Sequence, residues 1–131
     1  MDLHWSEQFA TGNEIVDLEH HYFVDTINRV NHALKDTDDP ETQARLLEEL
    51  VKYAEFHFIS EENVAAGMSS PELARHRERH QEILREIRLH VQQLLDGVYT
   101  SDEFVVFLLE WFAGHTIHED RRLLGLDKPS I

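Results

Sequence analysis

Ten histidines are present in a chain of 131 residues, and several of them recur at the spacing of one helical turn. His57 and Glu61 are four residues apart, and so are His76 and His80. On an α-helix, such pairs lie one above the other on the same face and reach a common point. Because neutral imidazole and carboxylate groups are ordinary ligands of transition metals, this spacing is typical of a metal site.

The apolar faces of the predicted helices show whether these groups converge. At about 100° per residue, each of four predicted helices turns at least one histidine into its apolar arc, and the second helix adds a carboxylate. A single buried histidine is most simply a hydrogen-bonded core residue. Five of them with a carboxylate would each need a separate compensation, whereas metal ions satisfy all of them together. The residues predicted to meet in the core are His20, His57, Glu61, His76, His80 and His115.

Helix start and stop signals define the elements that position these residues. Asp39-Pro40-Glu41 and Ser70-Pro71-Glu72 are each typical of a helix start, and Ser69 and Glu72 have the spacing of a capping box. Gly97 and Gly125 end apolar-periodic runs. We predict helices over about residues 17–36, 40–66, 71–96 and 101–124. Short connections make sequential helices antiparallel neighbours, which predicts an all-α, up-down-up-down four-helix bundle.

The remaining sequence is expected to belong to the same unit. The first sixteen residues predict an irregular N-terminal arm, with Trp5, Phe9 and Ile15 available to pack on the bundle. We see no internal repeat or linker and predict a single domain over residues 1–131.

Charge and composition exclude several classes of function. The chain carries 12 Lys+Arg against 26 Asp+Glu, a formal net charge of -14, which repels nucleic acids and anionic membrane surfaces. No apolar run reaches the length of a membrane span, and the N-terminus lacks the pattern of a signal peptide. The absence of cysteine excludes disulfides, thiolate catalysis and iron–sulfur clusters. We therefore expect a cytoplasmic protein with neither nucleic-acid binding nor membrane insertion, and a monomer.

Four motifs along the chain resemble the hemerythrin family, in its single-domain bacterial form. Val16-Asp17-Leu18-Glu19-His20 is similar to the family's Ile-Asp-x-Gln-His opening, with Glu19 where glutamine is usual. His57-Phe58-Ile59-Ser60-Glu61-Glu62 matches His-Phe-x-x-Glu-Glu. Pro71, His76 and His80 match Pro-x4-His-x3-His, and Trp111, His115 and Asp120 match Trp-x3-His-x4-Asp. The order and separation of the four motifs extend the resemblance over essentially the whole chain.

The resemblance implies a non-haem centre of two iron ions with a bridging oxo or hydroxo group. One iron would be held by His76, His80 and His115, the other by His20 and His57, with Glu61 and Asp120 bridging the two. Two octahedral ions offer about twelve positions, and this set with the bridging oxygen fills about eleven. The open position would belong to the iron with two histidines. The resemblance thus implies reversible O2 binding for carriage, storage or delivery, with a redox partner or an oxygen-consuming enzyme as partner.

Two other functions use the same centre. One is a di-iron enzyme that reduces peroxide or nitric oxide, and the other is a sensor module for O2 or iron. No separate general acid or base is evident in the core and no signalling domain is evident, so we favour an O2-binding protein over an enzyme or a sensor. An apolar wall around the open iron is predicted from Phe58, Trp111, Phe112 and Ile117, although ordinary core packing explains each of them equally well.

The choice between Glu119 and Asp120 is a conflict within the prediction. On a regular helix Asp120 lies about 140° from His115, whereas Glu119 falls near the centre of the apolar arc. The resemblance selects Asp120, and a bulge or local overwinding near residues 115–120 would reconcile the two. We predict Asp120 as the ligand. The other histidines are expected outside the ligand set: His21, His32 and His90 at the surface or rim, His4 in the arm, and His118 at the surface or beside the site.

Overall fold

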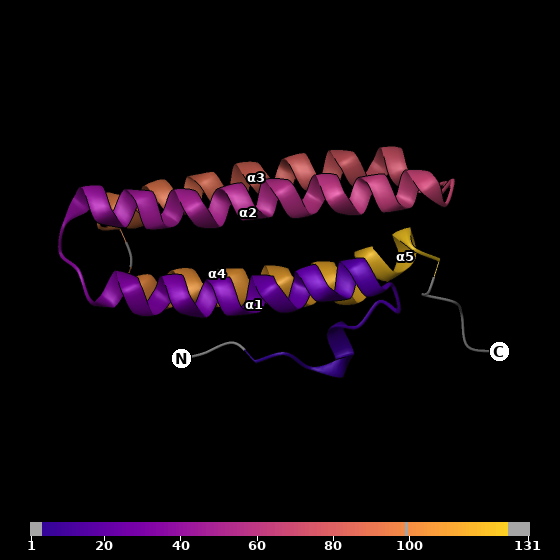
Figure 1. Cartoon of the computed structure of the whole chain (residues 1–131). Helices are drawn as coiled ribbons and strands as arrows, with labels where there is room; N and C mark the ends of the chain where they lie inside the picture. The colour runs from indigo at the N-terminus through magenta and orange to yellow at the C-terminus, as the bar shows by residue number, and fades with distance from the viewer. Residues whose placement is uncertain (1–3, 99, 126–131) are drawn as a thin grey trace.

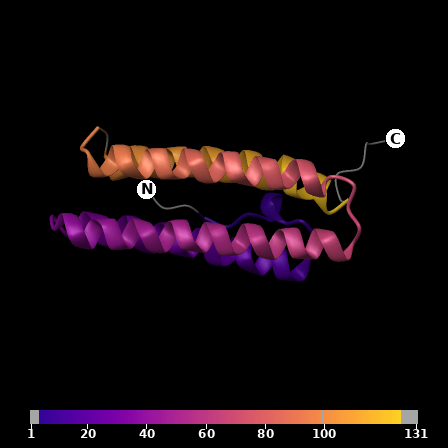
Figure 2. The same ribbon diagram turned by 90° about the horizontal axis from the view of Figure 1, so that it is seen from above.

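Four long helices run up and down side by side and form an antiparallel bundle (Figures 1 and 2). The structure, a computed structural model, describes residues 4–98 and 100–125, apart from the side chains of residues 8, 113, 116 and 117. Within these residues there is no strand. The all-α, up-down-up-down prediction is confirmed. The elements are η1 Glu7–Phe9, α1 Glu14–Lys35, α2 Pro40–Gly67, α3 Leu73–Leu95, α4 Ser101–Gly114, the π-helix η2 His115–Asp120 and α5 Arg121–Leu123.

The first long helix, α1, begins three residues earlier than predicted. Asn13 caps it, since its side-chain Oδ1 accepts hydrogen bonds from the backbone N–H groups of Ile15 (3.1 Å) and Val16 (3.0 Å). The arm is therefore shorter than predicted and contains the short 3-10 helix η1. The start of α2 agrees with the prediction, because Asp39 caps the helix and Pro40 is its first residue.

The start of α3 differs from the prediction in position and in chemistry. The helix begins at Leu73, its N-cap residue is Glu72, and no side chain caps it. The predicted capping box of Ser69 and Glu72 is therefore wrong. Ser70 instead donates its hydroxyl hydrogen to the backbone carbonyl of Leu123, at 2.6 Å. This hydrogen bond ties the turn between α2 and α3 to α5, on the opposite side of the bundle end.

The fourth helical run is divided into three elements rather than one. A capping box of Thr100 and Glu103 starts α4 at Ser101. After Gly114 the chain continues as the π-helix η2 and closes with the single turn α5. The run stops where Gly125 adopts a φ of 73°, a left-handed conformation that favours glycine. The predicted continuous helix over 101–124 is thus interrupted from His115 onward.

The arm closes over one side of the bundle through apolar contacts. Phe9 is buried, and its ring packs edge-on against that of Phe112, with centroids 5.0 Å apart. Trp5 is half-buried and lies against the ring of His21. Ile15 was predicted to pack as well, but it lies in α1 and is 55 % exposed. None of the helices in the described ranges is long and apolar enough to span a membrane.

Replacing Thr100 with alanine removes the hydroxyl group that caps α4. We expect the free energy of unfolding to fall by about 1 kcal/mol, because the N–H of Glu103 loses its acceptor. Urea denaturation followed by circular dichroism measures this. Thr100→Ser keeps the hydroxyl and should keep most of the stability; an equal loss in both variants would contradict the capping role.

Candidate metal centre

One end of the bundle gathers all seven residues predicted as ligands. α1 and α3 begin at this end, and α2 and the run from α4 to α5 finish there (Figures 1 and 2). All seven side chains are buried, and His76 is the most accessible at 5 %. Seven polar groups within an otherwise apolar core are costly unless they satisfy one another or share a bound cation. These residues are His20 on α1, His57 and Glu61 on α2, His76 and His80 on α3, and His115 and Asp120 on η2.

The imidazole rings surround the two carboxylates at the separation of neighbouring metal ligands. An Nε2 atom lies 2.8–3.1 Å from an oxygen of Glu61 or Asp120 in four of the five histidines: His20, His76, His80 and His115. The fifth, His57 Nε2, lies 3.7 Å from Glu61 Oε2. Adjacent ligand atoms about 2.1 Å from an octahedral ion are about 3.0 Å apart. The donor atoms are therefore spaced as ligands of a shared ion would be.

The donor atoms form two overlapping groups. In one, Glu61 and Asp120 join His76, His80 and His115; in the other, the same carboxylates join His20 and His57. Within each group the ligand atoms all lie within 4.8 Å of one another. Since both carboxylates belong to both groups, each is placed to bridge two cations. This is the division that the resemblance implies, three imidazoles on one side and two on the other.

Six N and O atoms in this cluster form no hydrogen bond of acceptable geometry within the described chain, although three of them lie within 3.1 Å of a carboxylate oxygen. They are the Nε2 atoms of His20, His57, His80 and His115, Oε2 of Glu61 and Oδ2 of Asp120. An unsatisfied polar atom in a protein core costs about 1–3 kcal/mol, so six of them converging on one place call for a common partner. All six are electron-pair donors, which is the chemistry that binds a metal cation.

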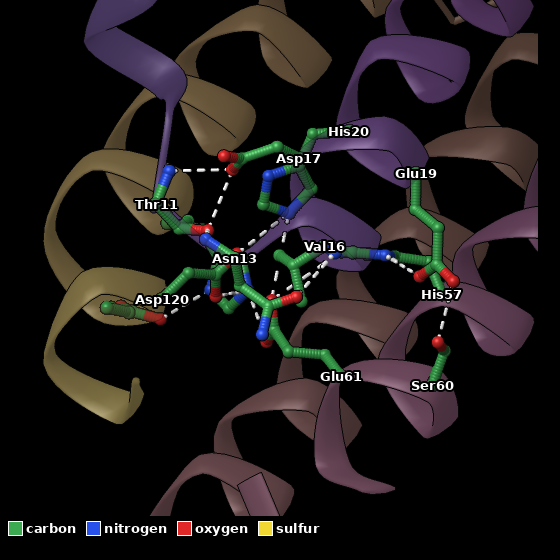
Figure 3. A network of polar contacts seen from close by, with 12 residues as sticks. Thr11, Asn13, Val16, Asp17, Glu19, His20, His57, Ser60, Glu61 and Asp120 are labelled. Atoms are coloured by element: carbon green, nitrogen blue, oxygen red, sulfur yellow. Dashed lines mark hydrogen bonds and ion pairs between the residues drawn. The ribbon is translucent and has the colours of Figure 1, made fainter. Parts of the chain in front are cut away.

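Three further carboxylates hold the outer nitrogens of the ligand rings. The Nδ1 atom of His57 donates to Glu19 Oε1 at 2.9 Å, a contact visible in Figure 3. His80 Nδ1 donates to Glu62 at 2.8 Å, and His115 Nδ1 donates to Glu119 at 2.6 Å. Because a carboxylate accepts but does not donate, Nδ1 carries the hydrogen, and Nε2 of the neutral ring keeps its lone pair for the cluster.

Sequence reasoning missed the role of these outer carboxylates, although a signal was present. Glu19 precedes His20, Glu62 follows Glu61, and Glu119 precedes Asp120. Each therefore lies one residue, or about 100°, from a predicted ligand on its own helix. At that angle Glu19 and Glu62 contact a ligand ring on a neighbouring helix. Glu119 contacts the ring of His115 on its own segment.

The π-helix resolves the conflict between Glu119 and Asp120. In a π-helix the backbone hydrogen bond joins residues five apart, so His115 and Asp120 lie one above the other. Asp120 Oδ1 is 2.8 Å from His115 Nε2, inside the cluster. Glu119 lies outside it, accepts from His115 Nδ1 and forms an ion pair with Arg79 at 3.0 Å. The predicted bulge is present, and both acids contact the same ring from opposite sides.

The electrostatics of the cluster favour bound positive charge. Burial lowers the pKa of His20, His76 and His115, but contacts with Asp120 and Glu61 outweigh it and raise the values to about 9, 9 and 10. Burial likewise raises the pKa of Glu61, but its histidine neighbours lower it to about 2. The pKa of Asp120 is also lowered, by His115 above all, against the effect of burial. Without metal, protons on the rings compensate the two carboxylates.

The other histidines lie where the sequence predicts them. His4, His21, His32 and His118 are exposed, and His90 is half-buried beside Phe107. None of the five belongs to the two donor groups found in the described part of the chain.

Aromatic rings pack directly on the ligand rings. Phe58 stacks on His80 with centroids 4.0 Å apart, Phe112 lies edge-on to His20 at 5.6 Å, and Trp111 lies against His115 at 5.8 Å. Phe23, which the sequence prediction omitted, contacts the rings of both His57 and Phe112. The side chain of Ile117, the fourth residue of the predicted wall, lies outside the described residues.

Comparison with known proteins places this geometry in one family. The family model described as the Hemerythrin HHE cation binding domain matches residues 11–126. A bacteriohemerythrin of Clostridium acetobutylicum is 25 % identical over 127 residues, covering 92 % of this chain and 97 % of that protein. A bacteriohemerythrin of Pseudomonas aeruginosa is 25 % identical over 118 residues, covering 90 % and 76 %. A wild-type hemerythrin crystal structure has the same fold, with a TM-score of 0.77 at 21 % identity, covering 91 % of this chain and 92 % of that one.

Substituting each of the two neighbouring acids on η2 by its amide distinguishes a metal ligand from a residue that only orients a ligand ring. We expect Asp120→Asn to lose at least one metal ion per chain, because a charge shared by both donor groups disappears. Glu119→Gln should keep both ions and bind them about 10–100-fold more weakly, as expected for loss of an outer carboxylate. Metal content and competition with a chelator measure the two effects. The reverse pattern would show that Glu119 is the ligand.

The metal-free protein should lose stability at alkaline pH. The pKa values of His20, His76 and His115 in the folded chain, about 9 to 10, exceed the ordinary 6.5. The stabilisation from their protonation is therefore complete below pH 6.5 and is lost as the pH rises through 9 to 10. Urea denaturation with a chelator present, at neutral pH and at about pH 10, measures it. The effect should be smaller in Asp120→Asn, and a pH-independent wild type would contradict the ion-pair description.

Proposed function

The chain belongs to the hemerythrin family, a family of non-haem iron proteins that bind O2, and from this premise we propose that it is a di-iron protein that binds O2 reversibly at one open iron position. The proposal covers carriage or storage of O2, or its delivery to an oxygen-consuming enzyme, and includes a redox partner as the other candidate partner. A cytoplasmic location and a monomeric state are part of it. The proposed ligands are the seven residues of the two donor groups.

The unequal division of the imidazoles carries the proposal. Three rings adjoin the shared carboxylates on one side and two on the other. Two octahedral ions offer about twelve positions, of which five imidazoles, two bridging carboxylates and a bridging oxygen fill about eleven. His20 and His57 would hold the ion with the open coordination position, and two bound iron ions would supply that position and the electrons for reversible O2 binding.

The carboxylates of this chain hold the ligand rings in place. Glu19 accepts from His57 Nδ1 and, with its second oxygen, from the hydroxyl of Ser60 at 2.6 Å (Figure 3). Both oxygens of the Glu19 carboxylate are therefore engaged, and this fixes the orientation of the His57 ring. Glu61 and Asp120 each contribute a negative charge where the cations would lie. Neutral imidazole rings and two negative charges converging on one place support the binding of metal cations.

Aromatic side chains exclude water from the side with two histidines. Phe23, Phe58 and Phe112 each have at most 1 % of their surface exposed and lie against His57 or His20. A dry apolar wall limits the access of water and protons to a bound gas molecule, and so favours release of O2 unchanged. This arrangement supports reversible binding rather than turnover of peroxide or nitric oxide.

Iron content and the response to air test the proposal. We expect two irons per chain and, after reduction without O2, a visible absorption band that forms in air and is lost under argon. A band that decays at once to the fully oxidised spectrum would favour the peroxide- or nitric oxide-reducing alternative. Absence of iron would contradict the di-iron assignment.

Phe112→Leu tests the role of the apolar wall. We expect two irons per chain, as in the wild type, but a shorter lifetime of the O2-bound form because water reaches the His20 side more easily. The matched control is Phe104→Leu, which changes a phenylalanine of α4 with the same 1 % exposure at the far end of the helix. Equal lifetimes of the O2-bound form in the two variants would contradict this role of Phe112.

A further inference from the structure

A small cavity opens beside the metal centre. It lies at the bundle end that carries the turn between α2 and α3, and Figure 1 shows where this end is. It lies between the first turns of α3 and the segment of η2 and α5. Its volume is about 120 Å³. A single water needs roughly 10–15 Å³ of such space, so the cavity holds several waters or one small polyatomic ion. Its polar lining is Glu72, Arg75, His76, Arg79, Glu119 and Arg122.

The charge of this lining is opposite to that of the whole protein. Three guanidinium groups face two carboxylates there, whereas the chain has 12 basic residues against 26 acidic ones. A gathering of positive groups on such a chain attracts small anions locally, although the protein as a whole repels large polyanions.

Two of the three arginines are not neutralised by acids. Arg79 is engaged with Glu119 at 3.0 Å and with Glu82 at 3.2 Å. The guanidinium groups of Arg75 and Arg122 make no hydrogen bond or ion pair within residues 4–98 and 100–125, whereas those of Arg29 and Arg77 are paired with acids. Two free guanidinium groups, one on α3 and one on α5, therefore border the same cavity.

The start of α3 adds to this positive character. No side chain caps the helix, and the backbone N–H groups of Ala74 and Arg75 donate no hydrogen bond within the described residues. A helix start carries a partial positive charge and unsatisfied donors, which favour an anion in the same place as the arginines do.

We propose that this cavity binds a small inorganic oxyanion of the phosphate class. Guanidinium groups present pairs of N–H donors that match the oxygen atoms of an oxyanion, and they remain charged at any physiological pH. The free groups of Arg75 and Arg122 are the main ligands. An anion held between them also lies against His76 and beside the Arg79–Glu119 pair, which continues to His115. The anion therefore borders the metal centre without entering its ligand set.

Titration with inorganic phosphate tests this binding. We expect saturable binding of one phosphate per chain by calorimetry, in iron-loaded and metal-free protein, at an ionic strength held constant with chloride. The double variant Arg75→Gln/Arg122→Gln should bind phosphate about tenfold more weakly or worse, because two charge-assisted contacts are lost. Both arginines are exposed, so their substitution should leave the fold and the iron content unchanged.

Arg85→Gln is the matched control. Arg85 lies on α3, is exposed and has no ion pair in the described chain, but it does not line the cavity. The substitution removes a positive charge from the same helix, and the variant should bind phosphate as the wild type does. Absence of saturable binding to the wild type, or equal weakening in both variants, would overturn the proposal. Binding to metal-free protein makes this result independent of whether the chain binds O2.

Discussion

The structure depends on the compensation of two carboxylates, Glu61 and Asp120, that are completely removed from solvent. A buried charge without a partner costs several kcal/mol, more than most single contacts in a small domain contribute. Five imidazole rings from four segments surround the pair. Protons on the rings or metal ions between them supply the positive charge that the core requires. The compensation of these two charges therefore contributes to the stability of the folded chain.

The buried polar groups that need this compensation all lie towards one end of the bundle. Towards the other end the core is made of aliphatic and aromatic side chains such as Leu47, Leu50 and Phe104, which need no such compensation. At the polar end the network continues outward, from the buried carboxylates through the rings to Glu19, Glu62 and Glu119. These three acids are half-buried, between core and solvent, and their contacts fix the orientation of the rings.

The same segment, η2, serves both the buried centre and its surface. Asp120 points into the cluster, while Glu119, its neighbour, lies between His115 and Arg79. A regular helix would place these acids on the wrong faces. The π-helix costs some regularity of the backbone, and such bulges occur often at functional sites because they re-aim a side chain. Because of the π-helix, Asp120 lies in the cluster and the adjacent Glu119 accepts a hydrogen bond from the outer nitrogen of His115.

The sequence alone predicted the bundle, the convergence of its histidines and the position of Glu61 among them. It could do so because helical periodicity is a local property that residue spacing reveals. The spacing of His57 and Glu61 needed no tertiary information. The conflict between Glu119 and Asp120 already indicated an irregular turn within residues 115–120, but only the folded chain showed that it is a π-helix. The late start of α3 and the partners of Glu19 and Glu62 also came from the folded chain alone. These features depend on contacts between helices: Asp120 must reach two groups of rings, and Ser70 is drawn to the carbonyl of Leu123. Periodicity places a residue on a face, but the neighbouring helix determines what that face meets.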